Sequence, residues 1–340
     1  MPLSLLAQLV AARTRALSGP IRDHAVLTPL VGLRVAAELC GCEILVKREH
    51  LQETGSFKVR GALAKLMSLS SDQRHRGVVT ASTGNHGLGV AHALSALGGS
   101  AVVCVPEDAS PVKVAAIRRY GVDVRVMGAQ PAETESLARR LACEAQLSYI
   151  SPYNDLDVIA GQGTVGSEIV EQLDGRPVDA VVAAVGGGGL VSGVAAAIKS
   201  ALPGVRVIGA SPANDAAMAA SVRAGKVVQI DALPTISDAT AGGIEGNSIT
   251  LPLCTELVDA WDLIEEPEIH SALRLMIDTE HQLVEGSAAV AIAAGLRAGR
   301  ATGGRSIAVV SCGANIASET LARALATAPR QPGDQDLRAG

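Results

Sequence analysis

The residue best suited to covalent chemistry is Lys58, in the stretch TGSFKVRGA that spans residues 54–62. Burial disfavours an ammonium ion, so an amine in so small and apolar a neighbourhood is driven toward its uncharged form. A neutral lysine amine attacks aldehydes and removes protons from carbon. Taken alone, a lysine in a turn is more often a solvated surface residue, so a second feature is needed.

A run of four glycines, from Gly186 to Gly189, supplies that second feature. It follows the apolar stretch 178–185 and precedes the helix-like stretch 190–200. Where Cβ atoms are missing, backbone N–H groups can approach a phosphate, and the start of a helix adds a favourable dipole. The alternative is a tight turn that allows close helix packing. An amine and a phosphate seat together predict pyridoxal 5'-phosphate as the cofactor.

The stretch GQGTVG (161–166) matches the dinucleotide-binding pattern G-x-G-x-x-G. That pattern needs a preceding strand and an acidic residue at the end of the next strand. Here the preceding stretch 151–160 is polar and contains Pro152, and the next strand ends in glycines. We therefore expect a glycine-rich helix start that packs against a sheet, and not a nicotinamide site.

The elements that must position these residues alternate between β-branched runs and Ala-rich helical stretches. The predicted strands are 77–82, 100–106, 122–127, 178–185, 205–211 and 306–311. This alternation predicts an α/β fold with parallel sheets covered by helices. The strands at 77–82, 178–185 and 306–311 each run into a glycine-containing segment. Because ligands bind at the carboxyl ends of strands in such sheets, we expect these three ends to meet at the site.

Six motifs follow one another along the chain: KREHLQETGSFKVRGA (47–62), STGNHG (82–87), PYNDLDVIAGQGT (152–164), GGGGLVSG (186–193), VEGSAAVAIAA (284–294) and SCGANI (311–316). In this order they resemble the motifs of the serine/threonine dehydratase family of pyridoxal-phosphate enzymes, which also contains serine racemase. The resemblance runs from about Thr28 to Asn315.

The resemblance implies the tryptophan synthase β-like fold, known as fold type II, with two open, twisted, mostly parallel sheets and the active site between two domains. A small domain of 51–150 would carry the asparagine loop. A large domain of 1–50 plus 151–340 would bind the cofactor. The chain ends soon after SCGANIASETLARALATA, so we expect no C-terminal regulatory domain.

The resemblance also assigns the residues that bind the cofactor. Lys58 is expected to form the Schiff base and to remove the Cα proton, Asn85 to bind the 3-oxygen of pyridoxal, and Phe57 to lie against the ring. The phosphate cradle corresponds to Gly186, Gly187, Gly188, Gly189 and Leu190. Glu285 matches an acidic residue near the ring, although a carboxylate at a helix N-terminus explains it nearly as well.

The substrate carboxylate is expected to bind the loop that contains Ser82, Thr83, Gly84, Asn85 and His86. Racemases of the family place a serine at the position of Thr83, and many threonine dehydratases place an alanine there. The hydroxyl of Thr83 could act as an acid, but its methyl group narrows the pocket. We therefore expect racemase activity to be minor.

Three further positions distinguish this chain within the family. The resemblance places Cys312 opposite the pyridine nitrogen, where most relatives carry serine, and implies that a neutral thiol or hydroxyl makes the cofactor a weaker electron sink than a carboxylate would. By itself, Cys312 would be read as a small buried hydrophobe. The two metal ligands of racemases and many dehydratases are replaced by Ser211 and Ala217, which Asp215 cannot compensate. We expect no metal site.

These assignments predict a lyase that releases a 2-oxo acid and ammonia from a 3-hydroxy-L-amino acid, L-threonine or L-serine first. The variant STGNHG and the stretch 238–250 also resemble dehydratase-like proteins linked to hydroxyectoine breakdown, so another 3-hydroxy amino acid, such as hydroxyaspartate or phenylserine, stays open. Less favoured alternatives are a β-replacement enzyme, a serine racemase, a nicotinamide dehydrogenase and a catalytically silent amino-acid sensor.

Composition narrows the partners and the compartment. A net charge of -5 and only 1% aromatic residues argue against nucleic-acid binding. No apolar stretch reaches the ~18 to 20 residues that span a bilayer. Six scattered cysteines without C-x-x-C spacing suggest reduced thiols in a cytoplasm, and the family suggests a homodimer. The start of the chain predicts an amphipathic helix that ends near Gly19-Pro20, in preference to a signal peptide.

Overall fold

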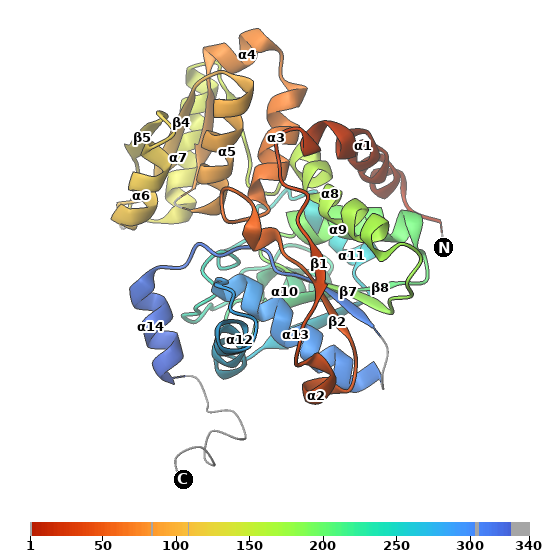
Figure 1. Ribbon diagram of the computed structural model, residues 1–340. Coiled ribbons are helices and arrows are strands. Elements are labelled where there is room, and N and C mark those ends of the chain that lie inside the picture. Colours follow the sequence, from red (N-terminus) through yellow and green to blue (C-terminus); the bar gives the residue numbers. More distant parts are fainter. Residues whose placement is uncertain (1, 83, 108, 303–305, 328–340) are drawn as a thin grey trace.

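Two sheets organise the chain in the computed structural model, which describes residues 2–82, 84–107, 109–302 and 306–327 (Figure 1). Among these residues the larger sheet has six strands in the order β1-β2-β10-β7-β8-β9, and the smaller has four in the order β5-β4-β3-β6. Every strand pair is parallel except β1 with β2. The predicted α/β class with two mostly parallel sheets is confirmed.

The strand bounds agree with the β-branched runs of the sequence. The larger sheet contains β1 (Leu30–Gly32), β2 (Ile44–Lys47), β7 (Ala180–Ala184), β8 (Arg206–Pro212), β9 (Ala260–Ile264) and β10 (Ile307–Val310). The smaller contains β3 (Val78–Ala81), β4 (Ala101–Val105), β5 (Asp123–Val126) and β6 (Ser148–Tyr149). All six predicted strands are present. Sequence reasoning missed β1, β2, β6 and β9.

Helices cover both sheets (Figure 1). Those that matter for the site are α1 (Leu5–Arg22), α3 (Lys58–Ser68), α5 (Asn85–Leu97), α6 (Pro111–Arg118), α7 (Pro131–Glu144), α8 (Leu156–Leu173), α9 (Gly189–Ala201) and α13 (Gly286–Thr302). The others are α2 (Ala36–Cys40), α4 (Ser71–Arg76), α10 (Ala217–Ala224), α11 (Thr250–Leu257), α12 (Glu266–Asp278), α14 (Ser318–Thr327) and the 3-10 helix η1 (Glu49–Leu51). No helix of the described ranges is long and apolar enough to cross a membrane.

Helix α1 extends further than the sequence suggested. It starts after Ser4, whose hydroxyl accepts a hydrogen bond from the backbone N–H of Ala7, and it includes Pro20 before ending at Arg22. The observed end at Arg22 therefore lies two to three residues beyond the predicted end near Gly19-Pro20. One face of α1 is buried against α8 and α9 (Figure 1), and the Thr14 hydroxyl donates to the carbonyl of Ala160.

The glycines of GQGTVG lie inside α8, where they allow helices to touch backbone to backbone. A Cβ at Gly161 would lie 2.5 Å from the carbonyl oxygen of Arg60, and one at Gly163 would lie 2.9 Å from that of Gly193. A Cβ at Gly166 would meet the carbonyl oxygen of Val194 at 2.8 Å. The prediction of a glycine-rich helical segment that packs closely is supported. The segment packs against α3 and α9, however, and not against a sheet.

Candidate active site

A cavity of about 840 Å³ lies where the three glycine-containing strand ends meet. The segments after β3, β7 and β10 all contribute to its wall, as expected for the carboxyl ends of parallel strands. Every described residue that the sequence placed in the site lines it: Phe57, Lys58, Ser82, Gly84, Asn85, His86, Gly186, Gly187, Gly188, Gly189, Leu190, Glu285 and Cys312. Thr83 lies outside the described residues.

Lys58 is the first residue of α3, and its side chain reaches into the cavity. Its Nζ donates a hydrogen bond of 2.8 Å to the carbonyl oxygen of Pro152 and lies 5.2 Å from the centroid of the Phe57 ring. Burial lowers the pKa of Lys58 to about 8, because the carboxylate of Glu285 only partly compensates for the lost hydration. A useful fraction of this amine is therefore uncharged near neutral pH.

The loop before Lys58 is fixed to the end of β10. The backbone N–H of Phe57 donates to the carbonyl of Cys312 at 3.1 Å, and Ser56 pairs with Gly313 in a β-bridge. Gly55 has a φ of +68°, and a Cβ there would lie 2.8 Å from the amide oxygen of Asn315. The lysine and the cysteine thus face the same cavity from segments that are hydrogen-bonded to each other.

The four glycines form the turn between β7 and α9. Helix α9 begins at Gly189, and Gly188 precedes it with a φ of +85°, which favours glycine. Each of these glycines also touches a neighbour: a Cβ would meet Thr240 at Gly186, Tyr153 at Gly187 and Gly189, and Cys254 at Gly188, all at 3.0 Å or less. The first N–H groups of α9 have no partner within the helix, so this turn combines bare backbone donors with a helix dipole.

Asn85 is held at both ends of its amide. Its Nδ2 donates to both carboxylate oxygens of Glu285 at 2.9 and 3.0 Å, and its Oδ1 accepts from Nδ2 of Asn315 at 2.6 Å. The carboxylate of Glu285 also accepts from the Ser287 hydroxyl at 2.5 Å and from the backbone N–H of Asn315 at 3.0 Å. Glu285 directly precedes α13. It is therefore a carboxylate at a helix N-terminus and also a residue of the cavity wall.

Cys312 closes the same hydrogen-bonded chain. Its Sγ donates to the Ser287 hydroxyl at 3.4 Å, and burial raises the pKa of the thiol to about 12. The thiol is therefore neutral at physiological pH. Sequence reasoning missed Ser287 and Asn315, although both stand in the quoted motifs 284–294 and 311–316. The motifs contained both residues, but only the hydrogen bonds of the structure identify them as partners of Cys312 and Asn85.

The N-terminus of α5 points at the cavity with an uncharged set of donors. Gly84 precedes the helix, and its backbone N–H lies 3.3 Å from the Ser82 hydroxyl. His86 Nε2 lies 3.2 Å from the carbonyl oxygen of Ile150, which can only accept a hydrogen bond. Burial lowers the pKa of His86 to about 3, with a further contribution from the charge of Lys58. The imidazole is thus neutral, and the helix start provides the attraction for an anion.

Two ion pairs cross the cavity and were not predicted. Lys113 of α6 donates to Asp238 at 2.8 Å, and Arg139 of α7 lies 2.8 Å from Glu245. Asp238 and Glu245 belong to the stretch 238–250, which the sequence singled out only as a family variant. Because both cations lie beside the smaller sheet and both carboxylates belong to one loop, the pairs join the two sides of the cavity.

The positions of the expected metal ligands are occupied by other contacts. The Ser211 hydroxyl donates to the carbonyl of Val185 at 2.9 Å, and Asp215 accepts from the backbone N–H of Gly242 at 2.8 Å. Ala217 begins α10. Within the described ranges we find no cluster of three or more side chains of the types that bind metal ions.

The residues of this cavity fit pyridoxal phosphate. The amine of Lys58 has a lowered pKa, as an aldehyde-binding lysine needs. The glycine turn before α9 provides backbone donors without a nearby carboxylate in its own segment. The neutral thiol of Cys312 and the fixed amide of Asn85 line the same cavity.

Comparisons with known proteins agree with this arrangement. Residues 21–313 match the family described as "Pyridoxal-phosphate dependent enzyme". The L-threonine ammonia-lyase of Thermotoga maritima is 40% identical over 85% of this chain and 71% of that protein. The processed threonine deaminase isoform 2 of Solanum lycopersicum superposes with a TM-score of 0.87, at 33% identity over 93% of this chain and 92% of its own. Serine racemase from Dictyostelium discoideum gives 0.83, at 33% identity over 90% and 98%.

Proposed function

This chain belongs to the family of pyridoxal-phosphate dependent enzymes, and from that premise we propose how its residues carry out the reaction of an L-threonine ammonia-lyase. The enzyme is a pyridoxal-phosphate dependent lyase of the threonine dehydratase type, with the fold of threonine deaminase. The observation that carries the assignment of roles is that Lys58, with its lowered pKa, shares one cavity with the glycine turn and the N-terminus of α5.

Bound pyridoxal phosphate supplies an aldehyde for amino groups and a ring that draws electrons from the substrate Cα. Lys58 holds the cofactor and then, as a free amine, takes the Cα proton onto Nζ. A pKa of about 8 suits both tasks, because the amine is neither fully protonated nor strongly basic near neutral pH. The carbonyl of Pro152 accepts a hydrogen bond from Nζ and orients the amine.

The other groups of the wall bind and orient. Gly186, Gly187, Gly188, Gly189 and Leu190 hold the phosphate with backbone N–H groups. Asn85 presents its amide to the oxygen of the ring, fixed in place by Glu285 and Asn315. Phe57 would pack against the ring. Cys312 would lie at the ring nitrogen as a neutral thiol and would give that nitrogen no negative partner.

The start of α5 binds the substrate carboxylate. The N–H groups of Asn85, His86 and Gly87 are among the first of the helix and lack partners within it. Ser82 and Gly84 complete the loop, and we place Thr83 there as a proton donor of secondary importance. With the carboxylate held and the Cα proton removed, the β-hydroxyl leaves as water, and hydrolysis gives a 2-oxo acid and ammonia.

The experiment is to measure 2-oxo acid and ammonia from L-threonine, L-serine, hydroxyaspartate and phenylserine. We expect L-threonine and L-serine to be turned over, and Lys58→Ala to abolish both turnover and the absorbance at about 410 nm of the lysine-bound cofactor. Lys226→Ala, which changes an exposed lysine that does not line the cavity, serves as the control. Turnover by Lys58→Ala that retains this absorbance would overturn the assignment.

Serine racemase activity is the second candidate, because the Dictyostelium discoideum enzyme has the same fold and 33% identity. We propose that it is minor here, since the thiol and the two departures at Ser211 and Ala217 separate this chain from racemases. Chiral analysis of serine after incubation decides the point. If D-serine formed at a rate comparable to that of 2-oxo acid, racemase activity would not be minor.

We propose that the two sheets mark two domains, 51–150 and the remainder, and that the smaller sheet with α6 and α7 closes over the substrate while α3 stays held on the larger domain by Glu49 and Glu168. The pairs Lys113–Asp238 and Arg139–Glu245 support this, because each joins the two sides of the cavity. We further propose a homodimer. Its support is a set of large apolar side chains, each more than 40% exposed, on or next to the edge strand β1 and η1: Leu27, Val31 and Leu51. Light scattering of the purified protein measures the oligomeric state.

We propose that the enzyme works in the cytoplasm on free amino acids, without nucleic acid or membrane. The net charge of -5 and the reduced state of all six cysteines support this. Five of these cysteines are buried, and only Cys143 is exposed.

A further inference from the structure

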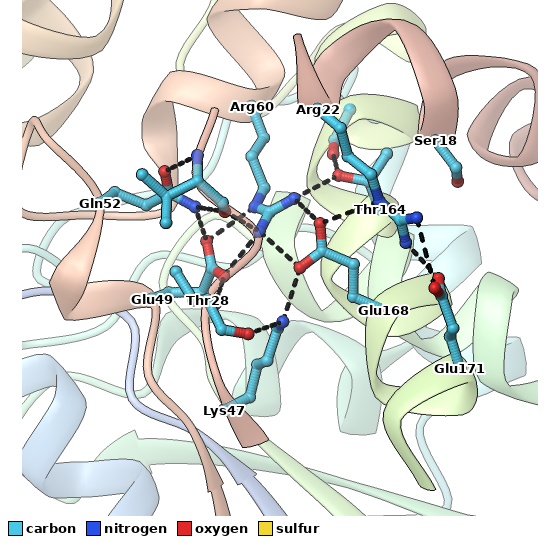
Figure 2. Close-up of polar contacts among 12 residues, drawn as sticks. Ser18, Arg22, Thr28, Lys47, Glu49, Gln52, Arg60, Thr164, Glu168 and Glu171 are labelled. Carbon is cyan, nitrogen blue, oxygen red and sulfur yellow. Dashed lines mark hydrogen bonds and ion pairs between the residues drawn. The ribbon is translucent and has the colours of Figure 1, made fainter. Parts of the chain in front are cut away.

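Four charged side chains are buried together where α3 meets η1 and α8 (Figure 2). Arg60 and Lys47 carry the positive charges, Glu49 and Glu168 the negative ones, and each side chain is at most 1% exposed. The charges balance, but the mechanism uses none of them. A buried ion cluster is costly to assemble, so its stabilising effect alone does not explain it.

Arg60 is the centre of this cluster (Figure 2). Its Nε and Nη2 donate to the two oxygens of Glu49 at 2.7 and 2.8 Å, and its Nη1 and Nη2 donate to the two oxygens of Glu168 at 2.7 and 2.8 Å. Further contacts of 3.2 Å reach the Thr164 hydroxyl and the carbonyl of Val26. The guanidinium is gripped along two edges, so neither it nor the backbone that carries it can turn.

The two carboxylates come from different elements. Glu49 belongs to η1, and Glu168 belongs to α8. The carboxylate of Glu168 also accepts a hydrogen bond of 2.5 Å from Nζ of Lys47. The residue after Glu49, His50, is hydrogen-bonded through its backbone and its ring to Ser311, immediately before Cys312. Arg60 therefore connects the first turn of α3 to the segment that presents Cys312.

Helix geometry relates this cluster to Lys58. Residues two apart in an α-helix point about 200° from each other around the axis. When Arg60 is fixed toward η1 and α8, Lys58 must point to the opposite side, where the cavity lies. The same turn is confined by backbone: a Cβ at Gly89 would lie 3.0 Å from the carbonyl carbon of Lys58, and one at Gly161 would lie 2.5 Å from the carbonyl oxygen of Arg60.

We propose that Arg60 is a positioning residue, whose doubly held guanidinium fixes the rotation of α3 and so sets the direction from which Lys58 reaches the cofactor and the substrate Cα. This inference rests on the proposed role of Lys58. The amine moves only through its own side-chain torsions, while the helix that carries it stays fixed during the reaction. Misplacing a reacting group by about 1 Å can lower a rate by about 100-fold.

The test compares Arg60→Lys with Lys47→Met in the enzyme loaded with pyridoxal phosphate. A lysine at position 60 keeps the charge but cannot hold two carboxylates as a fork does. Lys47→Met removes a charge from the same cluster and leaves all contacts of Arg60 in place. Both should unfold at lower temperature. Only Arg60→Lys should lower kcat, by about tenfold or more, with KM for L-threonine within about threefold.

A second readout does not depend on turnover. Two quantities are measured: the pH midpoint of the absorbance at about 410 nm, and the rate at which this absorbance appears when pyridoxal phosphate is added to the cofactor-free protein. Both should change in Arg60→Lys, and both should stay as in the wild type in Lys47→Met. If Arg60→Lys does not fold, Glu49→Gln replaces it in the test, because Arg60 then keeps its two hydrogen bonds to Glu168. The changes in kcat and in the absorbance should be in the same direction but smaller.

The proposal is overturned if the folded variant at position 60 or 49 keeps the kcat and the spectroscopic midpoint of the wild type. It is equally overturned if Lys47→Met loses as much kcat, since the cluster would then act only through stability. If the wild type itself released no 2-oxo acid, the proposed function would fail, but the spectroscopic comparison would still decide the role of Arg60.

Discussion

At the scale of single residues, burial shifts the pKa of each reactive group of the site toward its uncharged form. Burial lowers the pKa of Lys58 to about 8, lowers that of His86 to about 3 and raises that of Cys312 to about 12. The imidazole and the thiol are therefore neutral near pH 7, whereas the amine of Lys58 is uncharged only in part. Lys113 and Asp238 of the cavity wall are charged and form an ion pair that is partly exposed.

The lowered pKa of Lys58 makes the stability of the cofactor-free protein depend on pH. Between pH 8 and the ordinary lysine value of 10.5, the unfolded chain binds a proton that the folded chain has lost, so stability rises with pH. Lys58→Met removes this effect. At pH 7 the variant should be more stable than the wild type by up to about 3 kcal/mol, and the difference should vanish by about pH 10.5.

Urea unfolding at several pH values measures this difference. Lys226→Met, at an exposed position, should show no comparable pH dependence. A difference for Lys58→Met that is the same at pH 7 and at about pH 10.5 would contradict the assigned pKa.

Asn315→Ala tests the fixation of Asn85. The substitution removes donors to Oδ1 of Asn85 and to the carbonyl of Thr54, and leaves both acceptors unpaired in the wall. We expect the dissociation constant of pyridoxal phosphate to rise by about 5- to 50-fold, which corresponds to about 1 to 2 kcal/mol. Absorbance titration of the cofactor-free protein gives the value. Asn214→Ala, outside the cavity, should leave it unchanged.

At the scale of elements, close helix contacts determine where the lysine lies. Helix α3 is held against α8 at Gly61 and Gly161 and against α5 at Gly89. These glycines lie on three different helices: Gly89 and Gly161 leave room for the backbone of α3, and Gly61 leaves room for the side chains of Gln162 and Val158. The small residues after Lys58 therefore serve helix packing as much as they leave room for a cofactor.

Gly161→Ala should push α3 and α8 apart. Its Cβ would lie 2.5 Å from the carbonyl oxygen of Arg60 and 2.8 Å from Cα of Gly61, and neither backbone can yield cheaply. We expect a loss of about 1 to 3 kcal/mol in the free energy of unfolding, measured with urea. Gly204→Ala, where a Cβ has open space, should cost little. An unchanged stability for Gly161→Ala would show that the two helices separate freely.

Much of this fold could be predicted at the element level, and the limits have physical causes. The strands 77–82, 178–185 and 306–311 were evident because parallel strands buried on both faces are runs of apolar residues. Strand β9 (Ala260–Ile264) was missed because its residues are only partly buried, with Trp261 and Asp262 among them. The motifs identified Lys58 and Asn85, but Asn315 and Asp238 depend on contacts between segments distant in sequence, which no local pattern encodes.

At the scale of the whole molecule, the two sides of the cavity are joined by few exposed charges. Lys113 and Asp238 are 23% and 58% exposed, so their attraction is weak and sensitive to salt. This suits a closure that must open again to release the product. The buried cluster around Arg60, in contrast, belongs to the part that stays fixed.

Asp238→Asn should shift the enzyme toward the open state. We expect KM for L-threonine to rise by up to about fivefold at about 0.05 M KCl, with a smaller change in kcat, because an exposed pair contributes up to about 1 kcal/mol. At about 1 M KCl the variant and the wild type should converge. Initial-rate kinetics at both salt concentrations measure this. A KM difference that persists at high salt would argue against the ion pair Lys113–Asp238 as the contact that keeps the cavity closed.

The glycine turn has a consequence for descendants of this gene that lose the activity. Because Tyr153, Thr240 and Cys254 leave no space for a Cβ at Gly186 to Gly189, selection for folding alone would preserve all four glycines. Among the described residues, the amine of Lys58 donates to one carbonyl oxygen and lies over one aromatic ring, so packing gives little reason to keep it. An inactive paralogue would then be recognised by a missing lysine beside an intact glycine run, and the run by itself would say nothing about catalysis.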